Sequence, residues 1–277
     1  MLMRIAAALA LMSLACRGGE NRDAVADTSA STGTAQQGSA INAAYAATPA
    51  VQTVDKDAVA ALDRMATYLR SIKSFRVTAL TTRDEVLTNG QKAQYATTQD
   101  VLLEKPNKLL AKIDNDGGRR FLFYDGKTFT LWADGPRYYA SVPAPGNISQ
   151  LSDQLEKKFG IELPLRDLFL WGTDNQRGGA FTSAVDLGPS QIEGTSVEQY
   201  AFRQDGFDWQ IWIQKGDYPL PRKLIITTLT DDARPDYTAV FDWNLAPSFN
   251  DAIFTFDPPD GAKKIVLAQA DTMSASK

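Results

Sequence analysis

"RQDGFDWQIWIQKGDYPLPRKLIITT", residues 203–228, decides the fold of this chain. Two turn signals, Asp205-Gly206 and Lys215-Gly216, divide the stretch into short runs of alternating apolar and polar residues. The alternating residues after the first turn that share one face are Phe207, Trp209, Ile211 and Ile213. Asp-Gly between such runs is a strong local signal for a β-hairpin, and a period of two indicates strands with one buried face. The stretch therefore predicts neighbouring strands of an antiparallel sheet.

The same scheme recurs on both sides of this stretch. Asn89-Gly90 marks a hairpin turn, and residues 113–132, "IDNDGGRRFLFYDGKTFTLW", carry a Gly-Gly and an Asp-Gly turn around two strands. Later, Tyr237, Ala239, Phe241 and Trp243 alternate with polar residues. Strands at intervals of about 8–12 residues, joined by short turns, are typical of an antiparallel sheet. Its aromatic-rich face requires a cover.

Three segments are predicted to be helices. Asp55 and Asp57 are candidate caps for an amphipathic helix whose apolar stripe consists of Val59, Leu62, Met65, Leu69 and Ile72. Residues 147–160, "NISQLSDQLEKKFG", have helical apolar spacing and end at Gly160, a candidate C-cap. Residues 163–171, "LPLRDLFLW", are apolar nearly all round, with Pro164 in the favoured first turn. A helix so apolar is either part of the core or lies over an apolar cavity, and both interpretations stay open.

The composition excludes several function classes. The chain of 277 residues is 44% hydrophobic, carries a net charge of −4, and contains one cysteine and no histidine. Without histidine there is no Ser–His–Asp or Cys–His nucleophile, and the usual zinc ligand is missing. A single cysteine rules out an intrachain disulfide, and the acidic balance argues against a nucleic-acid partner. We therefore predict no enzyme, no cofactor and no metal site.

The N-terminus has the pattern of an export signal. Residues 1–16, "MLMRIAAALALMSLAC", are too short to span a membrane, and residues 1–15 read as a signal peptide. Ser13-Leu14-Ala15 suits ordinary signal peptidase, but the same residues followed by Cys16 resemble a bacterial lipobox, which makes Cys16 a candidate for lipidation. Residues 16–53, rich in small and polar residues, are predicted to be a disordered tether. The folded domain is expected at residues 54–268, with a tail at residues 269–277.

Residues 252–265, "AIFTFDPPDGAKKI", end the sheet in this interpretation. The alternation from Ile253 to Phe256 predicts a strand, and Pro258 and Pro259 stop it at the rim, because proline donates no ladder hydrogen bond. "FTFDPPDGAKKI" also resembles a terminal pattern of the LolA/LolB-like lipoprotein-carrier superfamily. "KPNKLLAKI" (105–113), "FYDGKTFTLW" (123–132) and "WQIWIQKGDYPLPRKLII" (209–226) agree with it in the expected order. The resemblance covers about residues 56–265 and is greatest to uncharacterised predicted periplasmic members.

The resemblance implies an α+β fold, in which helices cover the concave apolar face of an antiparallel half-barrel. In the carriers this cavity holds the acyl chains of lipoproteins. The arginine with which carriers latch their ligand has no clear counterpart, since Arg76 and Arg83 both lie on expected strands. Arg17 follows Cys16 in place of the Asp that resembles an inner-membrane retention signal, so a lipidated chain is expected in the outer membrane.

We expect the ligand to lie between the aromatic face of the sheet and residues 163–171, which would act as a lid. The predicted ligand-binding residues are Trp132, Leu163, Leu165, Leu168, Phe169, Trp171, Trp209, Ile211, Phe241 and Trp243. Core packing of the same tryptophans is the alternative. The predicted function is a periplasmic, membrane-tethered binder of lipid or lipoprotein acyl chains, with an envelope protein as a further partner. A non-catalytic interaction module with a self-filled barrel is the second hypothesis, and a carboxylate hydrolase is the third.

Overall fold

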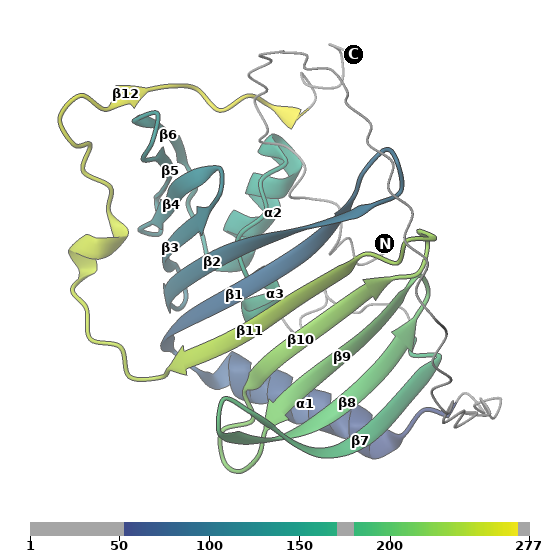
Figure 1. Ribbon diagram of the computed structural model, residues 1–277. Coiled ribbons are helices and arrows are strands. Elements are labelled where there is room, and N and C mark those ends of the chain that lie inside the picture. The colour runs from purple at the N-terminus through teal and green to yellow at the C-terminus, as the bar shows by residue number, and fades with distance from the viewer. Residues whose placement is uncertain (1–52, 171–179, 271–277) are drawn as a thin grey trace, which may run out of the picture.

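The structure, a computed structural model, describes residues 53–170 and 180–270, which form one open sheet with few helices (Figure 1). The twelve strands follow the order β12-β6-β5-β4-β3-β2-β1-β11-β10-β9-β8-β7, antiparallel except for the β12–β6 pair. The strands are β1 (Ser74–Val86), β2 (Lys92–Glu104), β3 (Lys108–Asn115), β4 (Gly118–Tyr124), β5 (Thr128–Ala133), β6 (Tyr138–Pro143), β7 (Ser183–Ile192), β8 (Thr195–Gln204), β9 (Phe207–Gln214), β10 (Pro221–Thr228), β11 (Asp236–Asn244) and β12 (Lys263–Lys264). The helices are α1 (Lys56–Ser71), α2 (Ile148–Phe159), α3 (Arg166–Leu170) and the 3-10 helix η2 (Asp251–Phe254). The predicted antiparallel sheet is confirmed. The predicted signal peptide, Cys16 and all of the predicted tether except residue 53 lie outside the described residues.

The predicted hairpin turns are present where glycine allows the required backbone. Gly90 between β1 and β2 has φ 82°, and Gly206 between β8 and β9 has φ 81°. A side chain at such a φ is strained, so Asn-Gly and Asp-Gly fix the hairpin positions locally. The register follows from these turns, with Val86 opposite Lys92 in the first hairpin and Gln204 opposite Phe207 in the second.

The start of α1 and the end of α2 are where their predicted caps place them. The side chain of Asp55 accepts a hydrogen bond from the Asp57 amide at 2.8 Å, and α1 buries Leu62, Met65 and Leu69. A capping box between Asn147 and Gln150 starts α2, and Gly160 ends it in the left-handed region. Both helices are amphipathic, so their apolar sides need a covering surface.

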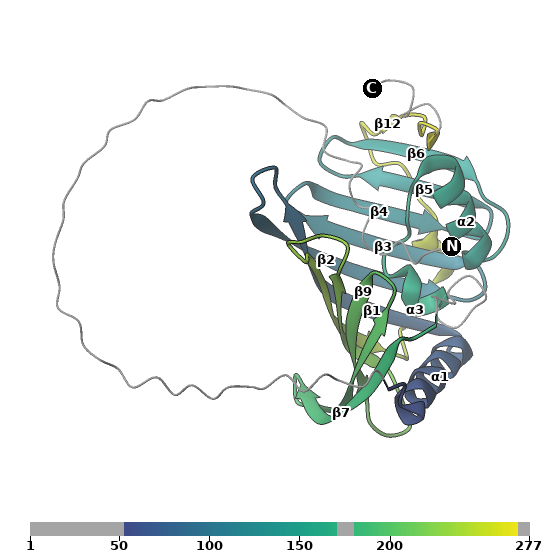
Figure 2. The ribbon, with the colours of Figure 1, turned by 90° about the vertical axis from the view of Figure 1, so that its right-hand side faces the viewer.

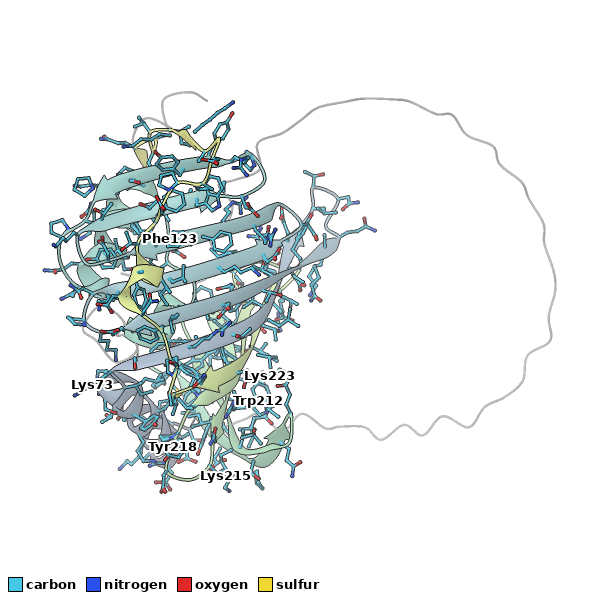
Figure 3. The ribbon with its side chains drawn as sticks, turned by 90° about the vertical axis from the view of Figure 1, so that its left-hand side faces the viewer. Lys73, Phe123, Trp212, Lys215, Tyr218 and Lys223 are labelled. Atoms are coloured by element: carbon cyan, nitrogen blue, oxygen red, sulfur yellow. The ribbon has the colours of Figure 1, made fainter. Side chains whose placement is uncertain are left out.

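The sheet has a different cover on each face (Figures 2 and 3). We call the face that packs against α1, α2 and α3 the inner face, and the opposite one the outer face. Side chains of all three helices and of strands from β1 to β11 share one continuous apolar core on the inner side. Residues 245–265, here called the strap, cross the outer face of β3 to β6 and end beside β6 (Figure 3).

The strand predicted from Ile253 to Phe256 is wrong. These residues form η2 and an extended segment without a ladder partner, because Asn250 caps a helical turn by accepting a hydrogen bond from the Ala252 amide at 3.0 Å. The alternating phenylalanines pack against the outer face instead: Phe254 is 1% exposed, and Phe256, which is half-buried, packs among the rings of β4 to β6. The segment does close the rim of the sheet, through β12, whose Lys263 amide donates to the Arg137 carbonyl at 2.9 Å.

Candidate functional site

An apolar cavity lies on the inner face between α3 and the strands β9, β10 and β11. Its volume is about 20 Å³. The lining residues are Leu165, Asp167, Leu168, Ile211, Pro221, Leu224, Tyr237 and Phe241. Seven of the eight are aliphatic or aromatic, which is the usual composition of a site for an apolar ligand. The polar groups come from Asp167 on α3 and the phenol of Tyr237.

The pleat of the strands explains why these side chains meet. Ile211 of β9 is opposite Leu224 of β10, which is opposite Ala239 of β11, so their side chains lie in one row across the inner face. In β11, Tyr237 and Phe241 are two residues to either side of Ala239 and point the same way. The sheet side of the cavity therefore consists of inner-face residues from three neighbouring strands.

The roof of the cavity is shorter than the sequence predicts. Leu165 has φ 53°, a left-handed conformation that interrupts the helix, so α3 begins at Arg166 and Pro164 does not occupy its first turn. Leu168 is buried over the cavity, and its amide donates to the Leu165 carbonyl at 2.9 Å. Arg166 forms an ion pair of 2.7 Å with Glu156 of α2. α3 is thus a single short turn held by the Arg166–Glu156 ion pair and by apolar contact, among other interactions.

Four predicted ligand-binding residues meet at the cavity: Leu165, Leu168, Ile211 and Phe241. Leu163, Trp209 and Trp243 belong to the same apolar core without lining the cavity. Trp209 stacks on Phe202 at a ring distance of 4.4 Å, and the Trp243 Nε1 donates to the Pro221 carbonyl at 2.8 Å. These two tryptophans support the walls. The side chain of Phe169 and all of Trp171 lie outside the described residues, so their predicted roles stay predictions.

Trp132 does not join this set. Phe129 and Leu131 of β5 point into the inner core, so the alternation turns Trp132 to the outer face. There its ring lies 5.6 Å from that of Phe256, and the strap covers it. Phe123 and Tyr139 surround the same Phe256 ring, at 5.3 and 5.1 Å, and Figure 3 shows Phe123 on this face. Placing Trp132 in the cavity with the other tryptophans was wrong, because its strand presents it to the opposite side.

Tyr237, Leu224, Pro221 and Asp167 line the cavity but were not predicted. The first two share the inner face with predicted residues, so strict alternation within β10 and β11 was the signal that could have found them. Pro221 and Asp167 have no such signal, because a bulge between Pro221 and Lys223 and the late start of α3 set their positions.

Burial changes the acid–base properties of the groups around the roof. Burial raises the pKa of Tyr237, and the nearby Asp167 carboxylate raises it further, so the phenol stays neutral. Burial also raises the pKa of Glu162 to about 7; Arg166 opposes this shift, whereas the carboxylates of Glu156 and Asp167 add to it. The roof therefore carries one carboxyl group that titrates near neutral pH.

A second, larger hollow lies on the other face and is polar. It measures about 530 Å³ and is lined by Arg76, Thr78, Ala96, Thr97, Thr98, Asp100, Lys112, Asp114, Asn115 and Asp116. Arg76 donates to both carboxylate oxygens of Asp100, at 2.8 and 2.6 Å, so its charge is already paired. Arg83, the other arginine considered as a ligand latch, is opposite Tyr237 and shares its face. The apolar cavity is the better candidate for an acyl chain.

Two further properties concern residues 53–170 and 180–270. This part of the chain holds no group of three or more side chains that could bind a metal ion. Within the same ranges, no helix is both long and apolar enough to cross a membrane.

Comparison with known proteins gives one family and several solved structures. A family model described as "Predicted periplasmic protein (DUF2092)" matches residues 58–268. The lipoprotein LppX from Mycobacterium tuberculosis is 13% identical, with 71% of this chain and 100% of that chain covered and a TM-score of 0.44. An uncharacterized conserved protein from Thermus thermophilus is 12% identical, with 76% and 99% covered and a TM-score of 0.42. The LolA superfamily protein NE2245 from Nitrosomonas europaea is 12% identical, with 72% and 97% covered and a TM-score of 0.34. No curated protein matches the chain. The resemblance to uncharacterised predicted periplasmic proteins that the sequence indicated is thereby confirmed.

Proposed function

The chain belongs to the family of predicted periplasmic proteins (DUF2092), and from this premise we propose that it binds the acyl chain of a lipid or a similar amphiphile beneath α3. The proposal rests on an apolar cavity on the inner face. The roof of this cavity is the five-residue helix α3, and Leu165, just before it, is in the left-handed region. So short a helix gains little stability from its own hydrogen bonds, and packing holds it in place. Displacing it therefore costs less than displacing α1 or α2.

The size of the cavity shows what binding requires. A volume of about 20 Å³ has room for about one water molecule, so no acyl chain fits beside Leu165 and Leu168. The ligand has to replace these two side chains, which together carry about eight carbon atoms. Each buried methylene group contributes about 0.8 kcal/mol, so only chains clearly longer than eight carbons gain free energy by the exchange. We expect a 16-carbon chain to bind and an 8-carbon chain to fail.

The inner face is, in this proposal, the concave face of a half-barrel, with α1, α2 and α3 as its cover. The protein binds without performing chemistry, and its folded domain extends over residues 54–268. Acylation of Cys16 after removal of residues 1–15 tethers this domain to the outer membrane, where it acts as a receptor, sensor or short-range transfer module for lipids or lipoproteins. The resemblance to the lipoprotein carriers and the family description support this placement.

A second candidate function follows from the same cavity volume. If Leu165 and Leu168 are permanent filling of the barrel, the protein is a non-catalytic interaction module that docks onto an envelope partner. The two functions differ in one observable property, the ability of the roof to open.

Titration of the mature full-length protein with saturated fatty acids of 8, 12 and 16 carbons tests the proposal. Displacement of a fluorescent acyl probe should occur with the longest chain and fade as the chain shortens. Leu80→Ser is the matched control: Leu80 is 54% exposed on the outer face, so this variant should bind as the wild type does. Equal loss of binding in the control would indicate adsorption to the surface, and no binding of any chain would favour the interaction module. Mass spectrometry of the N-terminal peptide tests the acylation of Cys16.

A further inference from the structure

One amide group on the inner face is buried and incompletely hydrogen-bonded. Gln99 of β2 is 7% exposed, and its Nε2 donates to Thr81 Oγ1 at 3.2 Å. The Thr81 hydroxyl in turn donates to the Thr97 carbonyl at 3.1 Å. The Gln99 Oε1 is buried and has no hydrogen-bond partner among the residues that the structure describes. Buried side-chain acceptors without a partner are rare and costly, so this one calls for an explanation.

Exchanging the oxygen and the nitrogen of the amide does not remove the problem. Oε1 would then accept from Thr81, but Nε2 would lose its acceptor, and the Thr81 hydroxyl could no longer donate to Thr97. Either assignment leaves one buried atom of Gln99 unpaired.

Gln99 lies close to the cavity. On the inner face it is opposite Ala79 of β1, and Ala79 is opposite Phe241 of β11, which lines the cavity. Neighbouring strands are about 4.8 Å apart, so Gln99 is roughly 10 Å from Phe241, with only an alanine methyl group between them. No bulky side chain of the sheet separates the amide from a ligand that lies against Phe241.

We propose that the Gln99 amide hydrogen-bonds the polar end of the bound amphiphile, with Oε1 accepting from an O–H or N–H group. The site then selects acyl chains whose head carries such a donor, a free glycerol hydroxyl or an amide, over chains whose head is an ester alone. This inference rests on the proposed acyl-chain binding and adds the class of headgroup.

The experiment compares two ligands with the same 16-carbon chain, 1-monopalmitoylglycerol and methyl palmitate, by displacement of a fluorescent acyl probe from the mature full-length protein. The wild type should bind the glycerol ester about 5- to 30-fold more tightly, the range expected for one buried hydrogen bond to a group otherwise unpaired. Gln99→Met keeps the length of the side chain and removes the unpaired polar atom, so it should fold at least as stably as the wild type. This variant should bind both ligands with equal affinity.

The matched control is Gln210→Met on the outer face of β9, where Gln210 accepts a hydrogen bond from Gln199 at 2.9 Å. It should keep the wild-type preference. If the wild type binds both ligands equally, a structural water or a purely structural role explains Gln99, and the inference fails while acyl-chain binding stands. If Gln99→Met still binds 1-monopalmitoylglycerol more tightly than methyl palmitate, the inference about the headgroup is also overturned. If neither ligand binds, both proposals fail. Should Gln99→Met not fold, Gln99→Leu gives the same comparison.

Discussion

Shortening Leu168 to alanine tests whether α3 is a lid or a fixed part of the core. Leu168 is 3% exposed and lines the cavity with Ile211 and Leu224. The substitution removes three carbon atoms, worth about 2.4 kcal/mol of transfer free energy at about 0.8 kcal/mol each. If the surroundings stay rigid, roughly 80 Å³ of new cavity adds about 2 kcal/mol at about 24 cal/mol per Å³. If α3 is fixed, Leu168→Ala should therefore lower the free energy of unfolding by about 4 kcal/mol.

If α3 is a lid, the same substitution should lower the free energy of unfolding by less. The cost of weakening its packing cannot exceed the free energy that keeps it docked, and a short segment of this kind opens at far less than the global free energy of unfolding. We expect Leu168→Ala to lower the free energy of unfolding by about 1–2 kcal/mol. We also expect it to bind a 16-carbon chain at least as tightly as the wild type does, because less side chain has to leave.

Urea denaturation followed by circular dichroism measures the first quantity, and displacement of a fluorescent acyl probe measures the second. Leu155→Ala is the matched control, since Leu155 of α2 is 0% exposed in the same core. This variant should lose about 4 kcal/mol of the free energy of unfolding. Equal losses in the two variants, together with unchanged binding, would refute the reasoning and leave α3 as permanent filling of the barrel.

Three further predictions concern groups outside the cavity. The pKa of Glu162 is about 7 when folded and near 4.5 otherwise, so the folded state holds this proton more tightly and stability falls as the pH rises between these values. Glu162→Gln should gain about 1–2 kcal/mol at pH 8 and nothing at pH 4, measured by urea denaturation; a gain independent of pH would contradict this. Phe256→Ala should cost about 3 kcal/mol and shift the emission of the uncovered Trp132 to the red, whereas Val266→Ala, at a residue 93% exposed, should do neither. Asp55→Ala removes the cap of α1 and should lower the thermal midpoint by the equivalent of about 1 kcal/mol; an unchanged midpoint would show that the cap contributes nothing.

Local chemistry determined much of this fold. The turns at Asn89-Gly90 and Asp205-Gly206, the period-two alternation of β9 and β11, and the caps of α1 and α2 all depend on neighbours within a few residues. Such signals can be read without knowing what the segment packs against, because backbone strain and side-chain capping act within one turn. The antiparallel sheet and two of its covering helices followed from these signals.

Contacts between distant segments decided the rest. Alternation sorts the residues of one strand into two faces, but it does not say which face of β5 matches which face of β9, so Trp132 and Trp209 were placed together although the sheet separates them. The strap illustrates the same limit, since Phe254 and Phe256 alternate as in a strand, but Phe256 packs on rings from β4 to β6 and Phe254 packs against Phe249. The Gln99 Oε1 is buried only because β2 is paired with β1 and β3 within the folded sheet. Faces, covers and unpaired atoms depend on the order of the strands, and that order comes from non-local pairing that no single stretch of sequence encodes.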